Sequence, residues 1–226
     1  MKKNKFIPFL IIIIAVALIV IVSKLVLDNT GKINQGVFRV NDLIVKSVVN
    51  TEEIQSETTA SAISDIKFNA SQENQISILV AKDSEAQSIY IDNISIKGPE
   101  KKGNIFISES DKEKQNINEI KKIDIYPVDR DGQYLIQLNV INSNFLTNAN
   151  LPDNTSAVTF DGTLLNTLGI KISEVNFKLN FSLNIVDSTG KVNVCKFKLD
   201  IPSEELLSNG ISVIREDVNN YRFYIK

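Results

Sequence analysis

The sequence predicts an all-β, β-sandwich-like domain that follows one N-terminal transmembrane helix and contains one or two very short helices. Apolar residues recur at every second position in several segments between residues 37 and 226, which is the period of a strand with one buried face. Glycine-containing turn signals separate these segments. We therefore expect residues 37–226 to form a β-sandwich.

An apolar run near the N-terminus predicts a membrane anchor. Three lysines among the first five residues precede an almost entirely apolar segment from Phe6 to Leu27. At about 1.5 Å per residue, a helix over residues 6–27 spans roughly 33 Å, which is enough to cross a hydrocarbon core of about 30 Å. We expect residues 6–27 to lie in the lipid bilayer, residues 1–27 to form a cytoplasmic basic tip and anchor, and residues 28–36 to be a linker.

A cleaved secretory signal is the alternative interpretation of this segment. Ala15-Val16-Ala17 has the small-x-small pattern that signal peptidase prefers. The apolar run continues from Leu18 to Val22, so cleavage at this pattern would leave an apolar N-terminus. A permanent anchor is therefore favoured.

The charges predict an orientation and exclude one class of partner. Three lysines flank the N-terminal side of the apolar run, whereas its far flank has only Lys24 followed by Asp28, which predicts a single-pass cell membrane protein with its N-terminus in the cytoplasm and its C-terminal domain outside. The chain has 25 basic and 27 acidic residues, and residues 1–27 contain four of the bases and none of the acids. The remainder therefore has 21 bases against 27 acids, a net charge of −6. An acidic domain predicts no nucleic-acid partner.

The clearest strand signal lies between Val175 and Ile185, where six apolar residues alternate with polar ones. Asp187-Ser188-Thr189-Gly190 then predicts a turn, because glycine adopts positive φ without strain. Residues 191–201 form the expected return strand of a hairpin. The apolar residues change parity after Val194, so we expect a bulge or twist at that point.

A second hairpin is predicted around Asp129-Arg130-Asp131-Gly132. Ile123 and Ile125 precede this turn, and alternating apolar residues from Tyr134 to Val140 follow it. Further strands are expected at residues 76–80, at residues 89–96 with a bulge at Asn93, and at five shorter segments, namely 37–49 with a division at Asn41-Asp42, 65–69, 104–108, 156–160 and 221–225.

Helical signals outside the anchor are short. Ser203 to Leu207 has acids in its first turn and is followed by Gly210, which predicts one or two helical turns. Residues 161–169 could hold another short helix. A polar and charged stretch near residues 110–120 separates two groups of strands, so a subdivision there into two smaller β domains is kept as an alternative.

The residue types exclude several chemistries. The chain has no histidine, which excludes Ser-His-Asp and Cys-His catalysis and most catalytic zinc sites. No Gly-rich phosphate loop follows a predicted strand, so we expect no nucleotide and no cofactor. Asp129 and Asp131 are the most clustered acids in a loop, and a carboxylate-dependent glycan hydrolase would need such a pair. The same acids suit a tight hairpin turn, which is the favoured interpretation, and the sequence leaves open whether they bind calcium.

Two further features concern the C-terminal part of the chain. Cys195 is the single cysteine and lies in an alternating segment, so we expect a buried small side chain and not a nucleophile. Tyr221-Arg222-Phe223-Tyr224 is a dense aromatic patch. On a strand its members alternate between two faces, and we expect one pair to lie in the core. Arg222 and Tyr224 are the expected partner-contact residues.

The layout of a basic N-terminus, one apolar helix and an exported β domain is similar to that of type IV pilins. The pilin processing signal is a Gly before an aromatic or Met, with a Glu five residues into the helix. Phe6-Ile7-Pro8-Phe9-Leu10 contains neither element, so we assign no family. The favoured function is non-enzymatic binding of a partner protein or a cell-envelope component. The alternatives are a carboxylate-dependent hydrolase of cell-wall glycan and an envelope or pilus-like assembly subunit.

Overall fold

The computed structural model describes residues 37–54, 67–109, 112–151 and 159–226. The predicted tip, anchor and linker over residues 1–36 lie outside these described residues. Among the helices within them, none is both long enough and apolar enough to cross a membrane.

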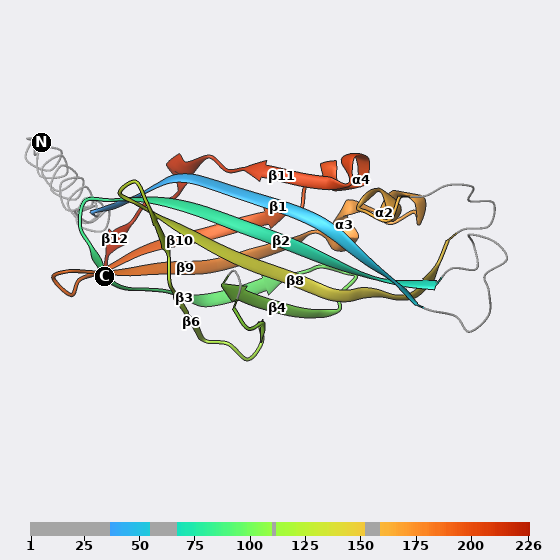
Figure 1. The fold of residues 1–226 in the computed structure, drawn as a ribbon, viewed down its shortest axis with the longest axis horizontal. Coiled ribbons are helices and arrows are strands. Elements are labelled where there is room, and N and C mark those ends of the chain that lie inside the picture. Colours follow the sequence, from blue (N-terminus) through green and yellow to red (C-terminus); the bar gives the residue numbers. More distant parts are fainter. Residues whose placement is uncertain (1–36, 55–66, 110–111, 152–158) are drawn as a thin grey trace, which may run out of the picture.

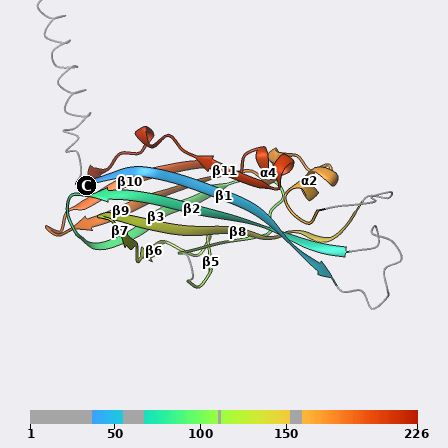
Figure 2. The same ribbon diagram turned by 45° about the horizontal axis from the view of Figure 1, so that its top comes forward.

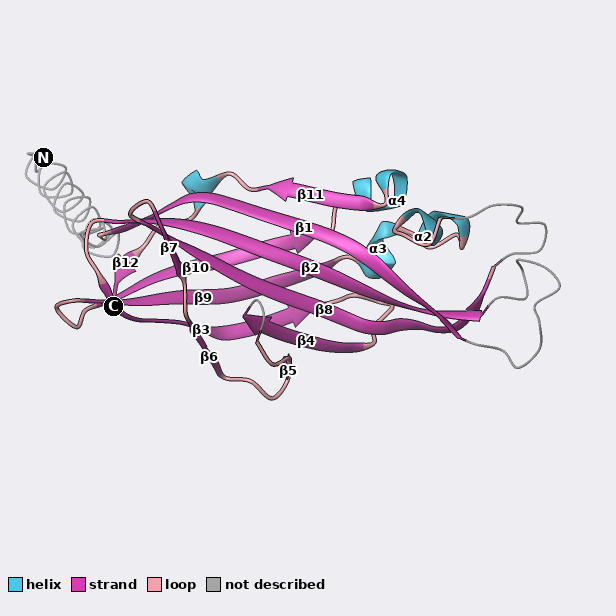
Figure 3. Ribbon diagram, viewed as in Figure 1, coloured by secondary structure: helices cyan, strands magenta, loops and turns pink. Residues whose placement is uncertain are grey.

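The described chain is mostly β-strand and folds into two antiparallel sheets with a few short helices (Figures 1 and 3). Sheet A has seven strands, with the order β11-β1-β2-β8-β4-β5 and with β7 also paired to β8. Its strands are β1 (Phe38–Ile54), β2 (Lys67–Lys82), β4 (Asn104–Glu109), β5 (Gln115–Asn116), β7 (Val128–Arg130), β8 (Gln133–Asn150) and β11 (Ile211–Arg215). The all-β class expected from the alternating sequence is confirmed.

Sheet B has five strands in the order β12-β10-β9-β3-β6. Its strands are β3 (Ala86–Lys97), β6 (Lys122–Ile125), β9 (Phe177–Asp187), β10 (Val192–Ile201) and β12 (Tyr224–Ile225). The helices are α2 (Thr163–Thr167), α3 (Ile172–Val175), α4 (Glu205–Asn209) and the 3₁₀ helix η2 (Val218–Asn220). The short helices predicted after Ser203 and within residues 161–169 are confirmed as α4 and α2.

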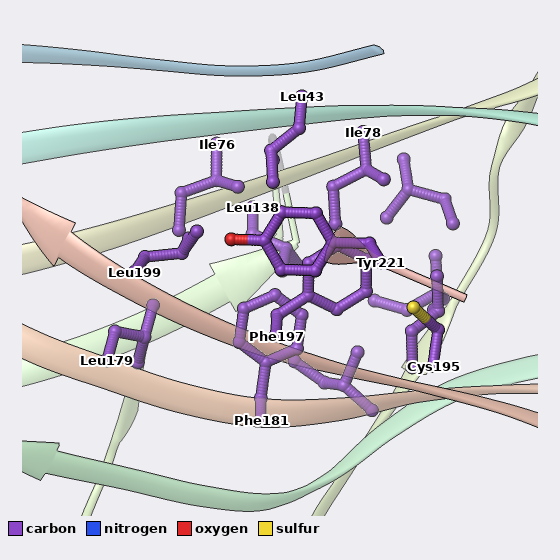
Figure 4. Close-up of a cluster of buried hydrophobic side chains, with 14 of the residues drawn as sticks. Leu43, Ile76, Ile78, Leu138, Leu179, Phe181, Cys195, Phe197, Leu199 and Tyr221 are labelled. Carbon is purple, nitrogen blue, oxygen red and sulfur yellow. The ribbon is translucent and has the colours of Figure 1, made fainter. Parts of the chain in front are cut away.

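The larger hydrophobic cluster takes residues from both sheets (Figure 4). At its centre Phe181, Phe197 and Tyr221 stack in series, with ring centroids 4.9 and 4.8 Å apart. Figure 4 shows Leu43, from β1, on the opposite side of this stack from β9 and β10. Alternate residues of facing strands therefore supply this core, as the period of two requires.

A smaller cluster covers the other end of the long strands β1, β2 and β8. There α2 and α4 lie against sheet A (Figure 2), and α3 adds Val175 to the same cluster. Leu164 and Leu206 of the helices and Phe68 of β2 are fully buried in this cluster. Sheet A extends beyond sheet B at this end, and the helices cover the part of sheet A that sheet B does not reach.

Buried polar side chains separate the two clusters on sheet A. Ser47, Gln72, Asn74 and Asn142 are fully buried at neighbouring register positions of β1, β2 and β8. Gln72 donates to Asn74 Oδ1 at 3.1 Å, and Asn74 donates to the backbone oxygen of Val140 at 3.0 Å. We call these four residues the polar row. Ser47 Oγ and Gln72 Oε1 have no hydrogen-bond partner among the described residues, whereas the other side-chain polar atoms of the row are hydrogen-bonded, which lowers the cost of burying them.

The hairpin of β9 and β10 is confirmed. Gly190 has φ +83° and donates its N–H to Asp187 O at 2.9 Å. The Asp187 carboxylate accepts from the Thr189 hydroxyl at 2.6 Å, and also from the N–H groups of Thr189 and Lys191. The bulge expected near Val194 is wrong, because the register runs unbroken along the pair. Val194 is buried on the outer face, where Tyr224 of β12 pairs with it, and this burial explains the change of apolar parity.

The expected bulge at Asn93 is confirmed. Asn93 has φ +51°, and the register between β3 and β9 shifts between Asp92 and Ser95. The division expected at Asn41-Asp42 is a bulge within one continuous strand, because β1 continues to Ile54. Of the strand expected at residues 65–69, residues 67–69 are the beginning of β2, and residues 65 and 66 lie outside the described residues.

The turn of the second predicted hairpin is confirmed, but the strand predicted to precede that turn is wrong. Asp131 and Gly132 have φ +51° and +75°, which is the two-residue turn that the Asp-Gly pair favours. The strand before this turn is β7, which pairs with β8 in sheet A. Ile123 and Ile125 belong to β6, which pairs with β3 in sheet B. Between β6 and β7 the chain changes sheets at Tyr126-Pro127.

Strands from both sides of residues 110–120 pair with each other in both sheets. β2 and β4 pair with β8, and β3 pairs with β9. The larger hydrophobic cluster also takes residues from both sides. Most of the strand expected at residues 156–160 lies outside the described residues. The strand expected at residues 221–225 is shortened to β12.

Candidate functional site

An open groove of about 750 Å³ lies where the beginning of β1 meets the C-terminal segment. It is lined by Val37, Phe38, Arg39, Val40, Asn41, Ala81, Asp83, Val218, Asn219, Tyr221, Arg222 and Phe223. Asp83 N–H donates to Val37 O at 2.8 Å and joins the end of β2 to the beginning of β1. The Asp217 carboxylate accepts from Asn219 N at 3.1 Å and fixes the first turn of η2. Both walls of the groove are therefore held by local hydrogen bonds.

The floor of the groove is aromatic. Phe38 and Phe223 are buried, with ring centroids 6.0 Å apart. The Tyr221 hydroxyl donates to Lys198 O at 3.2 Å or to Glu216 Oε2 at 3.3 Å. Burial and the nearby Glu216 carboxylate raise the pKa of Tyr221 above its ordinary value. Tyr221 is therefore a neutral hydrogen-bond donor at physiological pH.

The rim of the groove is charged. Arg39 donates from Nε to Asn41 Oδ1 at 3.1 Å, and Asn41 donates to Gln133 Oε1 at 2.8 Å, which orients the first guanidinium. Arg222 is exposed and has no ion-pair partner among the described residues. With Asp83 on the same rim, the groove presents two cations and one anion.

The expected division of the terminal aromatic patch into a buried and an exposed pair is confirmed. Tyr221 and Phe223 are buried, whereas Arg222 and Tyr224 are exposed. The two expected contact residues do not form one site. Arg222 lines the groove, but Tyr224 lies on β12 opposite Val194, and Lys196 Nζ stands 5.8 Å from its ring.

Asp129 and Asp131, the acidic pair of the second predicted hairpin, occupy positions that favour structural roles. Asp129 lies in β7 and accepts from Lys82 Nζ at 2.6 Å. Lys82 also contacts Glu85 at 2.8 Å, and its hydrogen bonds to Asp129 and Glu85 raise its pKa. Asp131 occupies the turn itself. Among the described residues no cluster of three or more Cys, Asp or Glu side chains could hold a metal ion.

Cys195 is fully buried in the larger hydrophobic cluster. Burial raises the pKa of its thiol to about 12, so the nucleophilic thiolate does not form at neutral pH. The expectation of a buried small side chain is confirmed.

Sequence reasoning missed most of the groove. Phe38 and Arg39 lie about 180 residues from Arg222 in the chain, and no local pattern connects them. The aromatic patch identified Arg222, and the one further local signal was Asp217, because an Asp side chain commonly accepts a hydrogen bond from the backbone two residues on and so favours a turn. Comparison with protein families, with curated proteins and with solved structures finds no match for this chain.

Proposed function

We propose that this chain is a single-pass membrane-anchored protein whose extracytoplasmic β domain binds a partner protein or a cell-envelope component and is not an enzyme. The anchor is residues 6–27, and a β-sandwich presents the binding surface. The observation that carries the proposal is the groove. Its floor is aromatic, and the guanidinium of Arg222 on its rim has no ion-pair partner among the described residues. This combination is typical of surfaces that recognise proteins.

The proposed ligand class follows from the composition of the groove. A guanidinium on the rim favours a carboxylate or another planar anion, and the aromatic floor favours an apolar neighbour of that anion. An acidic and apolar peptide segment has both features. The hydrolase alternative gains no support from Asp129, which is engaged with Lys82.

Site-specific cross-linking tests the proposal. A photoreactive amino acid is placed at Arg222 in the full-length protein in intact cells, and a matched probe is placed at Lys67, an exposed residue at the opposite end of β2 from the groove. We expect a discrete cross-linked partner from position 222 and none from position 67. Equal labelling from both positions, or none from either, would contradict the groove as a binding site.

Charge reversal supplies the second arm of the test. Arg222→Glu is expected to reduce the cross-linking yield at a probe on Asn219 by about tenfold, because the partner anion then faces a carboxylate. Lys67→Glu carries the same change of charge at the opposite end of β2 from the groove and should leave the yield unchanged. Protease added to intact cells should cleave the β domain if it lies outside, and protection of the domain would overturn the proposed orientation.

A further inference from the structure

The strand β11 forms one border of sheet A (Figure 1). It pairs with β1 over five residues, from Ile211 opposite Val48 to Arg215 opposite Ile44. No strand of the described ranges pairs with its other side. The remaining terminal strands of the two sheets, β5, β6 and β12, are shorter. β11 is therefore the longest terminal strand in the described part of the molecule.

The backbone groups of β11 that face outward can be assigned. Glu216 N–H donates to Leu43 O at 3.0 Å, and alternate residues of an antiparallel strand point their backbone groups in the same direction. Ser212 and Ile214 therefore bond to β1, while Ile211, Val213 and Arg215 direct their N–H and C=O groups to the open side. These three residues offer a regular ladder to another strand.

The side chains on this edge are unusual for an exposed strand. Ile211 and Val213 are 43% and 54% exposed, whereas Ser212 between them is fully buried. Natural edge strands are commonly blocked by proline, a bulge or a free charge. β11 has no proline and no register shift, and its one charge, Arg215, forms two hydrogen bonds of 2.9 Å with Asp42.

Acidic residues flank β11 at both ends and define the charge of its occupant. Glu204 and Glu205 at the beginning of α4 precede it, and Glu216 and Asp217 follow it directly. A second copy of the chain fits poorly. Antiparallel pairing of two β11 strands about Val213 would bring Asp217 of one copy beside Asn209 of the other, about one helical turn from Glu205. Like charges in such an arrangement oppose association.

We propose that β11 accepts an added strand from a partner protein, namely an extended segment with apolar residues at alternate positions and basic residues at both ends. The main-chain ladder supplies affinity, the exposed Ile211 and Val213 select apolar side chains, and the flanking acids select lysine or arginine. This inference rests on the proposed function and assigns one chemical class of partner to the open edge of β11, which adjoins the groove at Glu216 and Asp217.

A synthetic peptide tests the inference with the full-length protein in neutral maltoside micelles. The probe is a fluorescent, terminally blocked peptide in which Val-Thr-Val-Thr-Val is flanked by two lysines at each end. Its control has glutamates in place of the lysines. We expect saturable binding of the lysine peptide by fluorescence anisotropy and at least about tenfold weaker binding of the glutamate peptide.

Two substitutions at one position separate the ladder from the side chain. Val213→Pro removes the outward N–H and no bond to β1, so we expect at least about tenfold weaker binding with the fold retained. Val213→Thr keeps the N–H and a similar shape, so its affinity should remain within about threefold of the original. Should the proline variant unfold, Glu204→Gln with Glu205→Gln provides an independent test, with an expected loss of about threefold and a shallower salt dependence.

The contrary outcomes are distinct. Equal binding of both peptides, absence of binding, or unchanged affinity in Val213→Pro would overturn the strand-addition proposal. A dimer in sedimentation that Val213→Pro dissolves would also overturn it, in favour of a second copy. Cross-linking of a partner from position 222 would leave the proposed function standing in each of these cases.

Discussion

The two hydrophobic clusters of this molecule are enclosed in different ways. Facing strands of sheets A and B enclose the larger cluster, and the rings of Phe181, Phe197 and Tyr221 stack at its centre. The smaller cluster lies between one sheet and three helices. The polar row on sheet A marks the border between them.

This difference predicts that the two clusters differ in their local stability against unfolding. Strands of the larger cluster are fixed by hydrogen-bonded neighbours in each sheet. Helices of only four or five residues, such as α2, α3 and α4, do not persist alone in water. They depend on the side chains that they bury, so the smaller cluster should open first in native-state hydrogen exchange.

The largest expected effect comes from breaking the larger cluster. Phe197→Ala removes the middle ring of the stack, and such truncations cost about 3–5 kcal/mol because a cavity remains. The free energy of unfolding in urea measures this loss. Amide exchange should accelerate across both sheets, and acceleration confined to β10 would contradict a single cooperative core.

Truncation in the smaller cluster should have a more local effect. Leu206→Ala, at a fully buried position of α4, is expected to cost about 2–3 kcal/mol, at the low end for buried leucine because the short helices can shift. Amide exchange should accelerate in α2 and α4 and remain slow in β9. An equal acceleration in β9 would show that the two clusters unfold as one.

The polar row tests whether the border itself contributes to stability. Asn142 accepts from Gly103 N–H at 2.8 Å and donates to Lys101 O at 3.0 Å. Asn142→Ala leaves these two partly buried groups without their partners, at an expected cost of about 1 kcal/mol, the low end for a lost partner because water can reach both groups in part. Ser71→Ala, at a more exposed position beside the row, serves as the control and should cost less in the same urea titration.

The smallest expected effect is a pH dependence at the hairpin of the larger cluster. The Thr189 hydroxyl and nearby N–H groups hold the pKa of Asp187 at about 2, below its ordinary value of 3.8. The ionised form therefore favours the folded state, and its contribution is complete above about pH 4 and lost as the pH falls towards 2. Asp187→Asn should flatten the stability curve in this window. Identical curves would contradict the assignment.

The same comparison explains what the sequence could reveal. Alternation over Phe177 to Ile185 predicted β9 well, because both of its faces follow one regular register. In contrast, the C-terminal part of β8, which contributes to the smaller cluster, contains Asn144 and Asn148 with φ +52° and +50°. These two irregular positions break the period of two, so the side chains of the smaller cluster had no readable pattern.

The remaining misses have a common physical cause. The partner of the second hairpin was assigned by proximity in sequence, but the chain changes sheets after Ile125. Arg222 was identified as a contact residue from a local aromatic pattern, whereas its groove depends on Phe38 and Arg39 from the other end of the domain. Contacts between distant segments leave no periodicity in a single sequence.

The length of β1 has a mechanical meaning under the proposed topology. Its 17 residues, at about 3.3 Å each, carry the chain roughly 56 Å from the groove to the helix-covered end. The groove lies at the end where β1 begins, close to the proposed linker in the sequence. Under this topology the groove would be held near the bilayer surface. The helix-covered end of the domain would lie several nanometres farther from the bilayer.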